Sequence, residues 1–243
     1  MNGPSDSIQL KEAENWLLSV SPRLFDLYQQ SEKDDPKNYF DFKELFPWAS
    51  ASFARTEETL ARLDVEAWRK LCEKALPYVT VDDPLRRYQQ LWSALDEARG
   101  YVLLADQGYN QIEFIEPKKN KKGSAQSPDL TATKDGSTAI LEIKTINESN
   151  DCLGPNAAWR HGAITVRPDL SEEFKGKLVS TIEHARKQLN SYPHRTNRKI
   201  VLLVVRFDHG QKTGGHLYEE LNNFIVSQPT KDGAEVYHQA TLG

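Results

Sequence analysis

Three charged side chains lie close together in the segment SPDLTATKDGSTAILEIKT, which runs from Ser127 to Thr145. Two of them, Asp129 and Glu142, are carboxylates, and convergent carboxylates can hold a hard divalent cation such as Mg²⁺, which keeps several waters for a phosphate-bearing substrate. The third, Lys144, adds a positive charge two residues beyond Glu142. These residue types suit a metal site that binds a phosphate-bearing substrate.

A β-hairpin is predicted to bring the two carboxylates together. Asp135-Gly136 lies between two β-capable segments, and this dipeptide is typical of a two-residue hairpin turn. Such a turn places Lys134 opposite Ser137 and, further along both strands, Asp129 opposite Glu142. Facing residues in an antiparallel pair have Cβ atoms about 4.5–5.5 Å apart, where like charges destabilise the sheet. A positive charge is therefore expected between them.

The second strand of this hairpin, AILEIK, is predicted to be buried on both faces. Strand side chains alternate, so Leu141 and Ile143 form an apolar face while Ile140 shares the other face with Glu142 and Lys144. Charges in a buried strand are usually paired or bound to a metal. Two alternatives remain: the lysine alone partly neutralises the carboxylates, or the three charges face solvent on a surface hairpin.

The pattern Pro128-Asp129, twelve intervening residues and then Glu142-Ile143-Lys144 resembles the signature of the PD-(D/E)XK nuclease superfamily. Further segments fit the resemblance. Glu97 lies on a predicted helix ahead of the strand QIEFI, where family members often carry an extra metal-directed glutamate, although it also suits a solvent-facing position. QLNSY, from Gln188 to Tyr192, is similar to the Gln-hydrophobic-x-x-Tyr motif of the RecB-like branch, or is an ordinary amphipathic helix end.

The resemblance implies a metal centre. Asp129 and Glu142 would ligate Mg²⁺ or Mn²⁺, with the carbonyl of Ile143 as a further ligand and Glu97 as a second-metal or supporting group. The bound metal would activate a water and neutralise charge on the scissile phosphate.

The resemblance also assigns roles to the residues beside the metal. Lys144 would orient or deprotonate the attacking water and steady the transition state, and family members leave a 5′-phosphate and a 3′-hydroxyl. Gln188 and Tyr192 would hold the water network of the site or the substrate strand. A second match, Pro168-Asp169 followed by Glu173-Phe174-Lys175, has too short a gap for a hairpin and is interpreted as the capped start of a helix.

Positive charge is concentrated in the second part of the chain. The chain carries a net charge of −4, but residues 84–243 hold 21 basic and 19 acidic side chains, against 10 and 16 in residues 1–83. Two clusters either track a phosphate backbone or are ordinary solvated faces. The predicted nucleic-acid contacts are Lys118, Lys119, Lys121, Lys122, Arg186, Lys187, Tyr192 and Arg195, and the second cluster also contains Arg198 and Lys199.

The predicted elements belong to the α/β class. Residues 1–80 are expected to form a helical region that dimerises, binds a partner or recognises the target, and residues 81–243 a nuclease domain. The resemblance implies a restriction-endonuclease-like three-layer sandwich with a central mixed β-sheet. From Pro84 on, we expect a helix that ends near Gly108, the strand QIEFI, the hairpin, a helix at 171–190, a buried strand at 199–208, a short helix at 217–226 and a strand at 234–237.

Other features limit the function. Two cysteines, Cys72 and Cys152, cannot supply the four ligands of an iron–sulfur cluster, and neither a signal peptide nor a membrane-spanning run is visible, so we expect a cytoplasmic protein. The leading hypothesis is a Mg²⁺-dependent deoxyribonuclease that acts in defence against foreign DNA or in DNA processing, with a homodimer formed through the N-terminal region as one option. The alternatives are a catalytically silent nucleic-acid or protein-binding module and a metal-dependent RNase effector.

Overall fold

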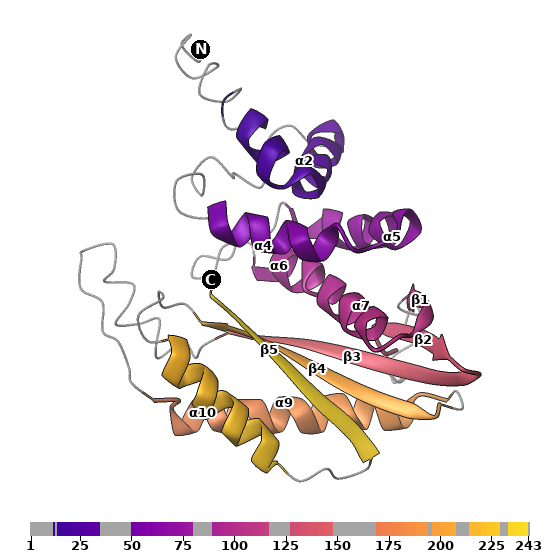
Figure 1. Cartoon of the computed structure of the whole chain (residues 1–243), viewed down its shortest axis with the longest axis vertical. Coiled ribbons are helices and arrows are strands. Elements are labelled where there is room, and N and C mark those ends of the chain that lie inside the picture. The colour runs from indigo at the N-terminus through magenta and orange to yellow at the C-terminus, as the bar shows by residue number, and fades with distance from the viewer. Residues whose placement is uncertain are drawn as a thin grey trace. The chain divides into compact units, whose positions relative to one another are not determined.

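The computed structural model of this chain describes residues 12, 14–34, 50–79, 89–116, 127–147, 169–193, 196–207, 214–228 and 233–242. The chain divides into two compact units, Met1–Val102 and Leu103–Gly243. The first unit is helical and the second contains the β-sheet (Figure 1). In the described part of the chain, no helix is both long enough and apolar enough to cross a membrane.

The helical first unit confirms the expected N-terminal region. Its core consists of leucine and aromatic side chains, among them Leu24, Phe53 and Leu71, each at most 1% exposed. Asp64 caps the N-terminus of one helix by accepting the amide of Ala67 at 2.8 Å. The elements are α2 (Pro22–Asp34), α4 (Ser50–Leu60), α5 (Val65–Ala75), the 3₁₀ turn η1 (Leu76–Tyr78), α6 (Gln89–Leu95) and the first part of α7 (Glu97–Asp106), and residues 14–20 are also helical.

The helix expected between Pro84 and Gly108 is interrupted at Asp96, which separates α6 from α7. The carbonyl of Asp96 accepts the amide of Arg99 at 2.9 Å, a bond that spans three residues, whereas the bonds of an α-helix span four. The Asp96 carboxylate also pairs with the Arg99 side chain. Aspartate favours helix starts over helix interiors, which explains the break. Gly108 ends α7 with φ of 78°, as expected, while Pro84 lies outside the described residues.

The sheet of the second unit has the order β1-β2-β3-β4-β5. The first three strands are antiparallel neighbours, and β3, β4 and β5 are parallel. This mixed five-stranded sheet confirms the α/β class and the predicted order of elements, although the last strand is longer than expected. The strands are β1 (Asn110–Phe114), β2 (Leu130–Lys134), β3 (Ser137–Asn147), β4 (Arg198–Phe207) and β5 (Ala234–Leu242).

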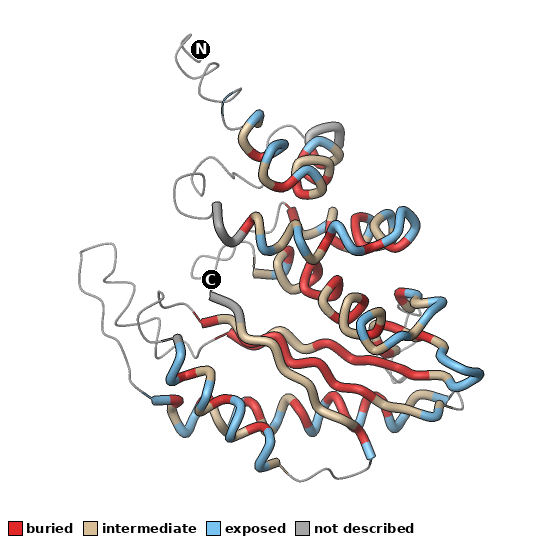
Figure 2. Tube along the Cα trace, in the orientation of Figure 1, coloured by how far each residue is buried: buried red, intermediate tan, exposed pale blue. Residues whose placement is uncertain are grey.

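Two helices, α9 (Glu172–Ser191) and α10 (Gly214–Ser227), cover the same face of this sheet (Figure 1). Ser171 caps α9 by accepting the amide of Phe174 at 3.1 Å. The apolar stripe of α9 packs against β3 and β4, as its helical spacing predicts. Strand β4 is buried along most of its length, so it forms the centre of the core (Figure 2). This packing fixes α9 over the strand that carries Glu142 and Lys144.

Candidate active site

The turn at Asp135-Gly136 has the predicted geometry. Both residues have positive φ, 50° and 75°, as a two-residue hairpin turn of type I′ requires. The strands pair from Lys134 opposite Ser137 to Leu130 opposite Leu141, which confirms the register expected from the turn.

The register departs from the expectation at Asp129. Leu130 already pairs with Leu141, yet the amide of Asp129 also donates to the Leu141 carbonyl, at 3.1 Å. Asp129 and Leu130 thus both lie opposite Leu141, as in a β-bulge. The predicted direct pairing of Asp129 with Glu142 is therefore not part of the ladder. Instead, Asp129 Oδ2 accepts the amide of Ile143 at 2.8 Å, and its carbonyl accepts the amide of Ile115 at 2.9 Å. The bulge directs the Asp129 carboxylate at the backbone between Glu142 and Lys144.

Glu142 lies in the buried part of β3 and is 2% exposed. Its Oε1 accepts a hydrogen bond from Lys144 Nζ, and the two groups form an ion pair. The Lys144 side chain is 26% exposed, so its ammonium group connects the buried carboxylate to the surface. The prediction of charges in a buried strand, rather than on a solvent face, is confirmed for Glu142.

Gln188 of α9 connects these groups through its side-chain amide. Its Nε2 donates to Glu142 Oε2 at 2.7 Å and to the carbonyl of Ser127 at 2.8 Å, while its Oε1 accepts from Lys144 Nζ at 3.3 Å. All of these contacts require the amide to be oriented in one way, because a reversed amide would place its oxygen against Glu142. Gln188 therefore holds the carboxylate, the ammonium group and the chain just before Asp129 in a fixed arrangement.

The donor set fits a hard divalent cation. A carboxylate oxygen offers two lone pairs, so Glu142 can accept from Lys144 and Gln188 and still bind a metal. The amide of Ile143 faces Asp129, and the carbonyl of a strand residue faces the same neighbour as its amide. Asp129, Glu142 and the Ile143 carbonyl therefore supply oxygen ligands of the kind that Mg²⁺ and Mn²⁺ prefer.

Glu97, the remaining candidate ligand, is the first residue of α7 and belongs to the first unit. It is 7% exposed, and its Oε1 forms an ion pair with Lys74 Nζ at 2.6 Å. Its role at the metal stays a prediction.

The predicted nucleic-acid contacts fall into three groups. Lys118, Lys119, Lys121, Lys122 and Arg195 lie outside the described residues. Lys187 is exposed on α9, whereas its neighbour Arg186 is only 6% exposed. Tyr192 follows α9 and packs partly buried against the core. Of the predicted contacts that the structure describes, Lys187 is the exposed one, and its contact with a phosphate stays a prediction.

Arg198, which belongs to the second basic cluster in sequence, lies on the opposite face of the sheet from α9. It forms a bidentate ion pair with Glu235, with both N–O distances 2.5 Å, and donates to Tyr237 at 2.9 Å and Tyr109 at 3.1 Å. Bonding to Arg198 lowers the pKa of the Glu235 carboxyl, against the effect of its partial burial. The sequence did not reveal this network, because its members come together only when β4 and β5 pair.

The fold and these contacts define an α/β protein with a mixed five-stranded sheet and a polar constellation at the start of its hairpin. No protein-family model, curated protein or solved structure matches the chain.

Proposed function

We propose that the chain is a metal-dependent nuclease that hydrolyses phosphodiester bonds in DNA and belongs to the PD-(D/E)XK superfamily that its motif resembles. The observation that carries the proposal is the meeting of Asp129, Glu142 and Lys144 where the bulge interrupts the hairpin, with Gln188 bonded to two of them. A carboxylate that is 2% exposed is costly unless its charge is compensated. Its ion pair with the Lys144 ammonium group, on the strand that the Asp129 carboxylate contacts, suits a role in catalysis.

Each side chain has a defined task in this proposal. Asp129, Glu142 and the Ile143 carbonyl hold the cation, which when bound supplies an activated water and neutralises charge on the phosphate. Lys144 is placed to orient the attacking water, because its side chain is 26% exposed and its ammonium group pairs with Glu142. Gln188 fixes Glu142 and Lys144 relative to each other and is a positioning residue.

The test is cleavage of supercoiled plasmid DNA and of RNA, side by side, in Mg²⁺ and in Mn²⁺. Wild-type protein should cleave DNA, while Asp129→Asn and Lys144→Met should lose cleavage and stay folded. Glu183→Gln, which removes an exposed carboxylate on α9, is the matched control and should cleave as wild type does. Discrete products indicate cutting at defined sequences, and progressive loss of linear DNA indicates processing from ends. Wild-type protein that is inert on both nucleic acids would overturn the proposal.

A catalytically silent binding module is the second candidate, and one observation favours it. Both oxygens of Glu142 already accept hydrogen bonds from side chains of the same chain, and Asp129 Oδ2 accepts a backbone amide. A constellation that is satisfied in this way can be purely structural. The silent module predicts DNA binding that is unchanged by Mg²⁺ and by Asp129→Asn, together with the absence of cleavage.

A further inference from the structure

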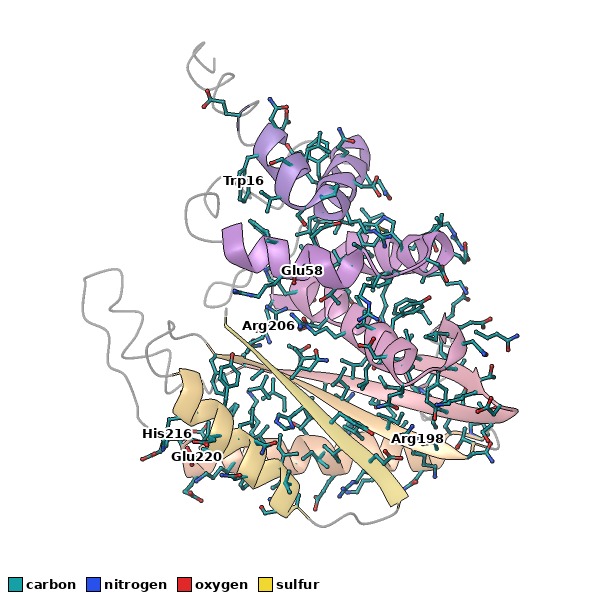
Figure 3. All side chains as sticks on the ribbon, in the orientation of Figure 1. Trp16, Glu58, Arg198, Arg206, His216 and Glu220 are labelled. Carbon is teal, nitrogen blue, oxygen red and sulfur yellow. The ribbon has the colours of Figure 1, made fainter. Side chains whose placement is uncertain are left out.

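A second group of potential metal ligands lies away from the hairpin motif, where the segment before α9 meets the first turns of α10. Asp169 comes from that segment, and His216 and Glu220 come from α10. One ligand atom from each of the three lies within 4.8 Å of the others, and His216 Nδ1 is 3.9 Å from Asp169 Oδ1. Figure 3 shows His216 and Glu220 projecting from the same part of α10. The group combines one imidazole nitrogen with two carboxylates.

The helix and the backbone orient two of these ligands. His216 and Glu220 are four residues apart, so they lie on the same face of α10 on successive turns. Glu220 Oε2 accepts the amide of Leu170 at 2.7 Å, and Leu170 directly follows Asp169. That bond joins the two chain segments and holds the Glu220 carboxylate next to Asp169. Carboxylates that bind metals are commonly fixed by hydrogen bonds of this kind.

A lysine competes for Glu220 but has a second partner. Lys175 Nζ is 3.0 Å from Glu220 Oε1 and 3.1 Å from Glu172 Oε1. A cation at Glu220 would therefore leave Lys175 paired with Glu172. Although burial opposes it, hydrogen bonding from Leu170 and Lys175 lowers the pKa of the Glu220 carboxyl.

We propose that Asp169, His216 and Glu220 bind a divalent transition-metal ion of the Zn²⁺ class. An imidazole together with carboxylates favours such ions over Mg²⁺, which takes oxygen ligands. The ion can reach the site from solvent, since the Asp169 and His216 side chains are 68% and 64% exposed. Water completes the coordination, and the bound ion clamps the segment before α9 to α10. This site shares no residue with the constellation at Asp129, and its existence does not depend on the proposed nuclease activity.

The test is isothermal titration of chelator-treated full-length protein with Zn²⁺. Wild-type protein should bind one ion that His216→Ala and Asp169→Asn each weaken at least ten-fold. His184→Ala removes an exposed histidine from α9 and is the matched control, expected to bind as wild type does. Asp129→Asn should also keep the binding, which separates this site from the proposed catalytic one.

Thermal unfolding gives a second measurement, because an ion that binds only the folded state raises the unfolding temperature. Zn²⁺ should raise it for wild type and His184→Ala but not for His216→Ala. The proposal is overturned if His216→Ala binds Zn²⁺ as wild type does, if both histidine variants lose binding equally, or if wild type binds none. Loss of the signal in Asp129→Asn alone would also overturn it, since that result assigns the ion to the hairpin.

Discussion

The carboxylate of Asp129 accepts the backbone amide of Ile143 at 2.8 Å, which directs it at the segment of the neighbouring strand that carries Glu142 and Lys144. This contact replaces a bond of the regular ladder at the point where the bulge interrupts it. Asp129 therefore has a structural task at the end of the hairpin in addition to its proposed task at a metal. The two tasks call for different substitutions.

Asp129→Ala is expected to destabilise the protein, while Asp129→Asn is expected to preserve its stability. Alanine leaves the Ile143 amide without this acceptor, which costs about 1–3 kcal/mol in unfolding free energy when a buried group loses its partner. Asparagine keeps a carbonyl oxygen that can accept the same bond. Urea unfolding of the two variants in EDTA measures the difference. Equal losses for the two variants would contradict the structural role of the carboxylate.

The hairpin register was predictable from sequence because it depends on two adjacent residues. Asp135 and Gly136 adopt positive φ values that few other pairs tolerate, and the turn then fixes every pair up to Leu130. The bulge at Asp129 could not be predicted in the same way, since the residue there also bonds the amide of Ile115, which directly follows β1. Local residues determine a turn, whereas a bulge is decided by the neighbours that the whole sheet provides.

The basic cluster around QLNSY shows the same limit. Arg186, Lys187 and Arg198 are close in sequence, but the fold places them in three environments: a buried helix position, an exposed helix position and an ion pair on the other face of the sheet. Their charge could be read from the sequence, while their exposure depended on how α9 packs. The cluster could not therefore be interpreted as one surface before the fold was known.

Arg186→Met is expected to raise stability. Arg186 is 6% exposed, and its Nε and Nη2 are enclosed without a hydrogen-bond partner among the residues that the structure describes. Methionine has a similar length and leaves no buried donor unsatisfied, so the unfolding free energy should rise by about 1–3 kcal/mol. Urea unfolding measures it, with Glu183→Met as the control on the exposed face of α9. A clear loss of stability in Arg186→Met would show that the guanidinium group has a stabilising partner.

The ion pair between Arg198 and Glu235 is expected to make stability depend on pH in the acid range. The pKa of the folded-state Glu235 carboxyl lies below its ordinary value of 4.5, because Arg198 bonds the ionised form. The ion pair therefore contributes its full stabilisation at pH values above the ordinary pKa. This stabilisation is lost as the pH falls through the lower pKa of the folded state. Glu235→Gln and Arg198→Met should each lower stability at pH 7 and approach wild type as the medium becomes more acid. Urea unfolding followed by circular dichroism, from pH 7 down to about 3, measures the stability of each protein. A stability difference between wild type and the variants that stays constant over this range would contradict the prediction.

Lys144→Met is expected to destabilise the protein more than the double variant Glu142→Gln with Lys144→Met does. Lys144 pairs with a carboxylate that is 2% exposed, and removing one partner of a buried pair typically costs about 3–5 kcal/mol because the other charge is left without compensation. Since the Lys144 side chain is 26% exposed, the unfolding free energy should fall by about 3 kcal/mol, the lower end of that range. In the double variant, glutamine at position 142 carries no charge that would need compensation. It also keeps a carbonyl oxygen that can accept the hydrogen bond from Gln188.

Added Mg²⁺ distinguishes a metal site from a purely structural ion pair in the same variants. If the cation binds beside Glu142, it compensates the charge that Lys144→Met leaves, so Mg²⁺ should stabilise this variant more than wild type. The double variant, which lacks the carboxylate, should gain less than either. Urea unfolding of wild type, Lys144→Met, Glu142→Gln and the double variant, with and without Mg²⁺, gives the coupling between the two side chains and its dependence on the metal. A Mg²⁺ response that is the same in all four proteins would place the ion elsewhere and leave Glu142 and Lys144 as a structural pair.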